Sequence, residues 1–219
     1  MASRHYNWLI YVLLAFLSSF LLFAFSCNNP TASPSQSKTP NPAISIRLDR
    51  IGVYDNREDI LRGAEGEIYV YVAVYDKKKP AQKLRFPQSS GQYYKLAKNA
   101  TIDINSIVFT TPEVGNNLGL TIVGYEDDGG GYEPLVYKAL GAALEAVVSS
   151  QTRGISELFN LNLAKSVGNF MGDADDFLGT YEKTFSVKDN WGIGEYTDIA
   201  CIDERGEKCL RLWFSILNQ

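Results

Sequence analysis

The chain has 219 residues and a formal net charge of −4 at pH 7, with 21 Lys and Arg against 25 Asp and Glu. This acidic balance argues against a nucleic-acid partner, because such surfaces need clustered basic residues. The single histidine, His5, lies in a segment that we expect to be removed. The mature chain therefore lacks Ser-His-Asp and Cys-His catalysis and the usual His-containing zinc sites.

The N-terminal segment, residues 1–26, is predicted to be a signal peptide or membrane anchor. An apolar run extends from Trp8 to Phe25, interrupted only by two serines, as is typical of export signals and short anchors. The stretch FAFSC, which ends at Cys27, resembles the lipobox of bacterial lipoproteins, and this resemblance implies acylation of Cys27. Ala24 stands where that family prefers Leu, and Phe25 where it prefers a small residue.

An ordinary cleaved signal or an uncleaved anchor are the alternatives. Each places the rest of the chain outside the cytoplasm, at the periplasmic or extracellular face of the cell envelope. Residues 27–42 are rich in Pro, Ser, Thr and Asn, which predicts a disordered tether between the membrane and a domain.

Residues 43–219 are expected to form one all-β domain, an antiparallel β-sandwich of about eight strands. Short stretches of alternating or β-branched residues, bounded by Gly, Pro, Asn or Asp, carry this prediction. Weaker strands are expected in 82–86 or 92–96. The remaining expected strands are 43–54, 67–75, 100–109, 118–125, 177–187, 196–203 and 208–217.

A helical insertion, about 133–168, is predicted between two of these strands. Val136, Leu140, Leu144 and Val147 recur at helical spacing. The apolar face that they form is expected to pack on its own sheet, with contact to a membrane or a partner as the alternative.

Cys201 and Cys209 flank a predicted hairpin with Gly206 in the left-handed conformation. If residues 204–206 form the loop, Asp203 faces Glu207 and Cys201 faces Cys209. An oxidising compartment then favours a cross-strand disulfide, and two free thiols are the alternative.

Acidic residues gather in the loops that precede and follow the insertion, in "VGYEDDGGG" and "GDADDFLG", and in an earlier loop that starts at Asp55. Here the chain resembles a C2 domain. Asp176-Phe177-Leu178-Gly179 matches the end of the third top loop of that family, and Glu126-Asp127-Asp128 resembles its Asp-x-Asp element. Glu67-Ile68-Tyr69-Val70 stands where the family has Asp-Pro-Tyr-Val.

Calcium takes about six to eight oxygens from carboxylates on flexible loops. The resemblance therefore implies a calcium site formed by Asp55, Glu67, Glu126, Asp128 and Asp176, with Asp127, Asp173 and Asp175 as substitutes. Glu replaces Asp twice, the Pro is absent, and the third loop carries the insertion, so the ligand geometry differs from that of the family. The alternative is that these acids form solvated turns without a metal.

The predicted function is therefore binding rather than catalysis, since the chain also lacks G-x-S-x-G and phosphate-loop motifs. We expect an exported, lipid-anchored protein that uses calcium to support lipid or protein contact, with a glycan as a third kind of partner. The alternatives are a carbohydrate-binding module, with aromatic residues and paired acids along a groove away from the acidic loops, and a structural envelope lipoprotein without a metal site.

Overall fold

The computed structural model describes residues 40–56, 65–76, 79–127, 138, 175–203 and 205–219. Residues Pro40–Gln219 form one compact unit. The predicted signal segment and the tether as far as residue 39 lie outside the described residues. In the part of the chain that is described, no helix is long and apolar enough to cross a membrane.

The unit is built almost entirely of strands, as the alternating sequence pattern predicts. Both weaker candidates are strands, and of the predicted insertion only Lys138 is described. The elements are β1 Ile44–Val53, β2 Gly66–Asp76, β3 Lys79–Phe86, β4 Tyr94–Leu96, β5 Thr101–Thr111, β6 Asn117–Asp127, β7 Asp175–Ser186, the 3-10 turn η3 Val187–Gly192, β8 Gly194–Ile202 and β9 Lys208–Asn218.

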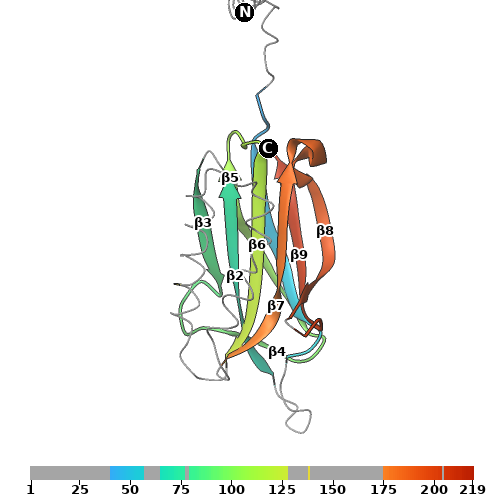
Figure 1. Cartoon of the computed structure of the whole chain (residues 1–219). Coiled ribbons are helices and arrows are strands. Elements are labelled where there is room, and N and C mark those ends of the chain that lie inside the picture. The colour runs from blue at the N-terminus through green and yellow to red at the C-terminus, as the bar shows by residue number, and fades with distance from the viewer. Residues whose placement is uncertain (1–39, 57–64, 77–78, 128–137, 139–174, 204) are drawn as a thin grey trace, which may run out of the picture. The chain divides into compact units, whose positions relative to one another are not determined.

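The strands are arranged in the order β3-β2-β6-β7-β8-β9-β1-β5, and β4 pairs with the start of β2. Every described pairing is antiparallel. β7 and β8 meet at one pair, Thr180 and Ile202, so the path divides into two four-stranded layers, β3-β2-β6-β7 and β8-β9-β1-β5 (Figure 1). The predicted antiparallel sandwich is confirmed.

Alternate residues of both layers fill the space between them, as period-two patterns require. Ile46 and Leu48 of β1 pair with Ile216 and Phe214 of the neighbouring strand β9, and all four side chains belong to one continuous core. Trp191 of η3 belongs to this core, and its indole N–H donates to the Gly115 carbonyl at 2.7 Å. The Gly115 amide in turn donates to Asp76 Oδ1 at 3.0 Å, so the turn, the β5–β6 connection and the end of β2 are tied together.

The β8–β9 hairpin confirms part of its prediction and corrects the rest. Gly206 has φ +82°, and the Asp203 amide donates to the Glu207 carbonyl at 3.0 Å, as expected. A register shift then places Cys201 opposite Leu210, so Cys209 is an extra residue on β9. Its carbonyl instead accepts the Tyr54 amide at 2.7 Å. No disulfide joins the two buried cysteines, and the predicted pairing of Cys201 with Cys209 is wrong.

Candidate functional site

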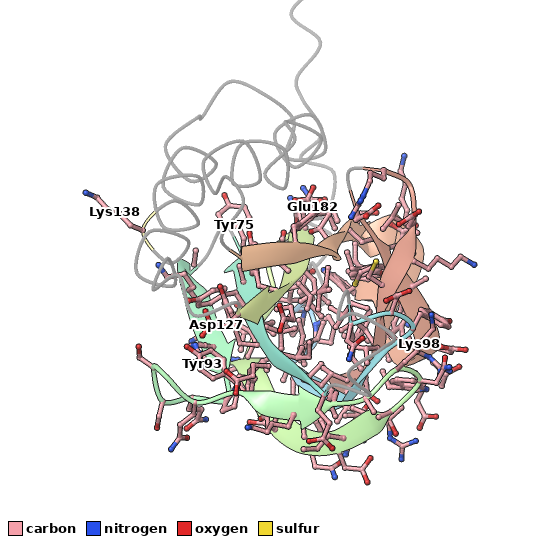
Figure 2. The ribbon with its side chains drawn as sticks, turned by 90° about the horizontal axis from the view of Figure 1, so that it is seen from below. Tyr75, Tyr93, Lys98, Asp127, Lys138 and Glu182 are labelled. Carbon is pink, nitrogen blue, oxygen red and sulfur yellow. The ribbon has the colours of Figure 1, made fainter. Side chains whose placement is uncertain are left out.

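The acidic residues singled out in the sequence meet at one end of the sandwich. β2 and β7 begin there, β6 ends there, and the C-terminus lies at the opposite end (Figure 1). We call this region the acidic end and define it by Asp55, Glu67, Glu126, Asp127 and the strand positions 175–176. Figure 2 looks onto it, with Asp127 and Lys98 on opposite sides of the view.

Among the acids of the acidic end whose side chains the structure describes, Glu126 is the most buried, with 2% of its surface exposed. The β2–β6 ladder places it opposite Ile68, and its Oε1 accepts the Glu67 backbone amide at 3.2 Å. A carboxylate so far from water needs hydrogen bonds or a cation to remain charged. Burial and this hydrogen bond fix the position of the Glu126 carboxylate at the edge of the core, as a metal ligand requires.

Gly66 makes room for this arrangement at the first position of β2. A Cβ atom there would lie 3.0 Å from Asn56 Cβ and 3.2 Å from Glu126 Cγ. The buried Asn56 donates to the Leu96 carbonyl at 3.3 Å, which ties the segment after β1 to β4. The segments that carry Asp55, Glu67 and Glu126 are thus packed against one another.

Two lysines partly neutralise the acidic end. Lys98 Nζ lies 3.0 Å from Asp55 Oδ2, and Lys95 Nζ lies 3.3 Å from Glu67 Oε1. All four side chains are more than a third exposed, and exposed pairs of this kind contribute only about 0–1 kcal/mol each. A divalent cation could displace these lysines at little cost. The sequence reasoning missed them because their position depends on β4 pairing with β2.

The predicted ligands are placed as follows. Asp55, Glu67 and Glu126 lie at the acidic end, and Asp176 stands opposite Glu126 in the β6–β7 register. Asp127 stands opposite Asp175 in the same ladder. Asp128 and Asp173 lie outside the described residues. The predicted ligand set therefore stays a prediction, although four chain segments that carry it converge.

The β8–β9 hairpin adds acids that the sequence reasoning treated only as part of a turn. Asp203, Glu207 and Cys209 have potential ligand atoms within 4.8 Å of one another. Asp203 Oδ1, however, accepts the Arg205 amide at 2.9 Å and the Glu207 amide at 2.7 Å. Its Oδ2 lies 3.5 Å from Arg205 Nε. Both carboxylate oxygens of Asp203 therefore contact groups of the turn, so we assign Asp203 a role in stabilising the turn rather than in binding a metal.

The stretch Asp176-Phe177-Leu178-Gly179 has a structural reason for its spacing. Leu178 is fully buried in the core. Gly179 has φ +116°, and a Cβ atom there would lie 2.8 Å from the Ile202 carbonyl carbon. The motif therefore crosses from the acidic end to the point where β7 meets β8. Its last two residues, Leu178 and Gly179, therefore serve the fold.

Glu182 of β7 is a carboxyl outside the acidic end, on the face of the β2-β6-β7 layer that carries Tyr75 (Figure 2). It stands opposite the buried Thr121 in the β6–β7 ladder. Its Oε1 atom has no hydrogen-bond partner among the described residues. Burial raises the pKa of Glu182 from 4.5 to about 7. The folded state therefore favours the neutral acid.

This shift predicts a pH-dependent stability. Because the folded pKa lies above the unfolded one, the free energy of unfolding should fall as pH rises from about 4.5 to about 7 and then level off. Glu182→Gln should remove this slope and stabilise the domain at pH 8 by on the order of 1–3 kcal/mol. Urea unfolding at pH 4.5 and pH 8 measures both, with the exposed Glu195→Gln as control. An equal slope in Glu182→Gln and wild type would contradict the assignment.

Cys201 is not a candidate nucleophile. Burial raises the pKa of its thiol, so the reactive thiolate is disfavoured.

Comparisons with known proteins give fold-level neighbours alone. No protein-family model matches the chain, and no curated protein matches it in sequence. The C2A domain of plant extended synaptotagmin 1 is similar in structure, with 12% identity and a TM-score of 0.39 over 83% of this chain and 97% of that chain. A C2 domain protein from Ramazzottius varieornatus has 13% identity and a TM-score of 0.33 over 81% of this chain and 88% of that chain.

Human GIVD cytosolic phospholipase A2 has 12% identity and a TM-score of 0.36 over 83% of this chain, but the match spans only 17% of that chain. Because every one of these TM-scores is below 0.5, the fold assignment rests on the strand ladders. Two of these neighbours are C2 domains, the family that the sequence resembles.

Proposed function

We propose that this chain is a lipid-anchored binding protein of the cell envelope, whose acidic end holds calcium and thereby contacts an anionic lipid surface. The observation that supports the proposal is the convergence of carboxylate-bearing segments around the buried Glu126. Calcium accepts several carboxylate and backbone oxygens in flexible geometry. It would replace the weak lysine contacts and relieve the repulsion between neighbouring acids.

The proposed anchor is the acylated Cys27, which would keep the domain near a membrane. An extracellular calcium site is expected to be weak, with a dissociation constant of about 10⁻⁴–10⁻³ M. Such a site would be occupied steadily and would order the loops rather than sense a signal. With calcium bound, the cation would bridge the protein carboxylates and lipid phosphates.

Thermal unfolding of residues 40–219 with calcium and with excess chelator tests the cation site. At a calcium concentration of about 100 times the dissociation constant, the stabilisation is about 2.7 kcal/mol. This corresponds to a rise in Tm of roughly 5–10 °C for a domain of this size. Glu126→Gln should abolish the rise, whereas Glu113→Gln, which alters an exposed acid between β5 and β6, should keep it.

Cosedimentation with phosphatidylserine vesicles, with and without calcium, tests the lipid contact. Calcium-dependent pelleting that is lost in Glu126→Gln supports the proposal. No calcium shift in Tm would contradict it and favour a structural lipoprotein. A calcium shift without vesicle binding would keep the cation site and turn the search to a protein partner.

A further inference from the structure

A groove of about 290 Å³ lies on the outer face of the β8-β9-β1-β5 layer, away from the carboxylates of the acidic end. Its walls combine two aromatic side chains, two guanidinium groups and three carboxylates, and its lining residues come from all four strands. Its lining includes Arg47, Asp49, Arg50, Asp103, Asn105 and Trp213. This volume lies at the lower end of the usual range for small-molecule sites, about 300–1,000 Å³.

The groove coincides with breaks in otherwise regular ladders. β1 has a bulge at Asp49, because Leu48 pairs with Phe214 while Arg50 pairs with the next residue, Trp213. On the other side of Trp213, the β8–β9 register also shifts, between Tyr196 and Ile199.

β5 adds a third irregularity, since Asn105 has φ +49° inside a strand. Bulges and left-handed residues in strands cost stability and are often found where side chains are redirected toward a ligand. Irregularities therefore occur on three of the strands that surround the groove.

The bulge residue Asp49 places its carboxylate in the groove as a hydrogen-bond acceptor. Asp49 Oδ2 accepts the Ser215 hydroxyl at 2.6 Å, and Oδ1 accepts Arg47 Nε. Arg50 of β1 pairs with Asp103 of β5, and its Nε donates to Asp103 Oδ1 at 2.5 Å. Each arginine uses its Nε in these pairs, so the remaining N–H groups of its guanidinium are available as donors. The groove therefore carries guanidinium donors on Arg47 and Arg50 beside the carboxylates of Asp49 and Asp103.

Trp213 supplies the apolar part of the groove. The guanidinium carbon of Arg50 lies 5.7 Å from its ring centroid, and that of Arg211 lies 5.0 Å from it. These contacts hold the indole in place on the sheet face. A held aromatic ring beside fixed donors and acceptors suits a ligand with one apolar face and several hydroxyl groups.

The charges of the groove argue against an anionic ligand. Asp49, Asp103 and Glu195 line it together with Arg47 and Arg50, and both arginines already pair with a carboxylate. A phosphate or sulfate would meet more negative than positive groups here. A neutral polyhydroxyl ligand meets no such repulsion.

We infer that this groove binds a neutral sugar residue of a glycan, through Trp213 and the Arg–carboxylate pairs beside it. The inference is independent of the proposed calcium site. The glycan would bind to the face of the β8-β9-β1-β5 layer, while the acidic end remains available for lipid.

Binding of labelled residues 40–219 to an array of neutral gluco-, galacto-, manno- and N-acetylglucosamine oligosaccharides tests the inference. The assay is run in chelator, so failure of the calcium proposal does not affect it. Binding is expected and should not change between low and high salt, because screening weakens only charged contacts. Trp213→Ala and Asp103→Ala should each weaken it about tenfold or more. Ile107→Ala, an exposed residue of β5 outside the groove, should not.

Each variant is checked by thermal unfolding. Asp103→Ala is expected to leave the Tm unchanged, because the Asp103 side chain is 60% exposed. Titrating the captured oligosaccharide into the protein and following tryptophan fluorescence gives a second readout. A change in this fluorescence reports on Trp213, since the other tryptophan of this unit, Trp191, is buried. No neutral glycan bound, binding only to phosphorylated or sulfated glycans, or full binding by folded Trp213→Ala and Asp103→Ala would each overturn the inference.

Discussion

Gly179→Ala is expected to lower the free energy of unfolding by about 3–5 kcal/mol, among the largest losses for a single added methyl group in this chain. The reason is that β7 and β8 approach closely where the two layers join. An added Cβ would lie 2.8 Å from the Ile202 carbonyl carbon and 2.9 Å from that of Cys201. Both are backbone atoms, which cannot turn away as a side chain can. The φ of +116° adds strain for any residue with a Cβ.

Gly91→Ala is the matched control for this change. Gly91 also has a positive φ, +73°, but a Cβ there meets nothing within 4 Å. It should cost only about 1–2 kcal/mol, the strain of a left-handed residue. Urea unfolding of both variants and of wild type measures the difference. If Gly179→Ala is no less stable than Gly91→Ala, the close approach of β7 and β8 is not what requires the glycine.

Trp191→Ala is expected to cost about 3–5 kcal/mol, because it removes a large aromatic side chain from the core. Only 8% of Trp191 is exposed, and its indole donates to Gly115, whose amide binds Asp76. Loss of the ring leaves both a cavity and a buried carbonyl without this donor. The end of the sandwich opposite the acidic end should loosen first.

Trp191→Phe separates these two effects. Phenylalanine keeps most of the apolar contact and loses only the hydrogen bond, so a cost of about 1–3 kcal/mol is expected. Chemical unfolding gives the free energies, and hydrogen exchange at the Gly115 and Asp76 amides shows whether the loss is local. Equal costs for Phe and Ala would mean that the hydrogen bond, rather than packing, dominates at this position.

Much of the fold could be predicted because its signals are local. Period-two alternation in β1 and β5 identifies strands whatever their partners, since side chains of a strand point alternately to opposite faces. Gly206 predicts its turn because a left-handed residue is needed there, and the structure confirms it. The acids of the predicted calcium site were singled out for a similar reason, because they stand near the ends of recognisable strands, and that ligand set stays a prediction.

The disulfide prediction was wrong because the register of the β8–β9 pair differs from the one expected. The loop was assigned correctly, but the extra residue Cys209 shifts the register by one. Its carbonyl accepts the Tyr54 amide, so the shift depends on β1, which lies far away in the sequence. No pattern within the hairpin reports that contact.

The sequence by itself determined the all-β class, the strand segments and the position of the acidic loops, because backbone sterics and alternating hydrophobicity act over a few residues. Only the tertiary structure decided which charges meet. It brings Lys98 to Asp55 through β4, and it builds the groove around Trp213 from β1, β5, β8 and β9. Those contacts depend on register and bulges, which are set by packing between strands that are distant in the chain.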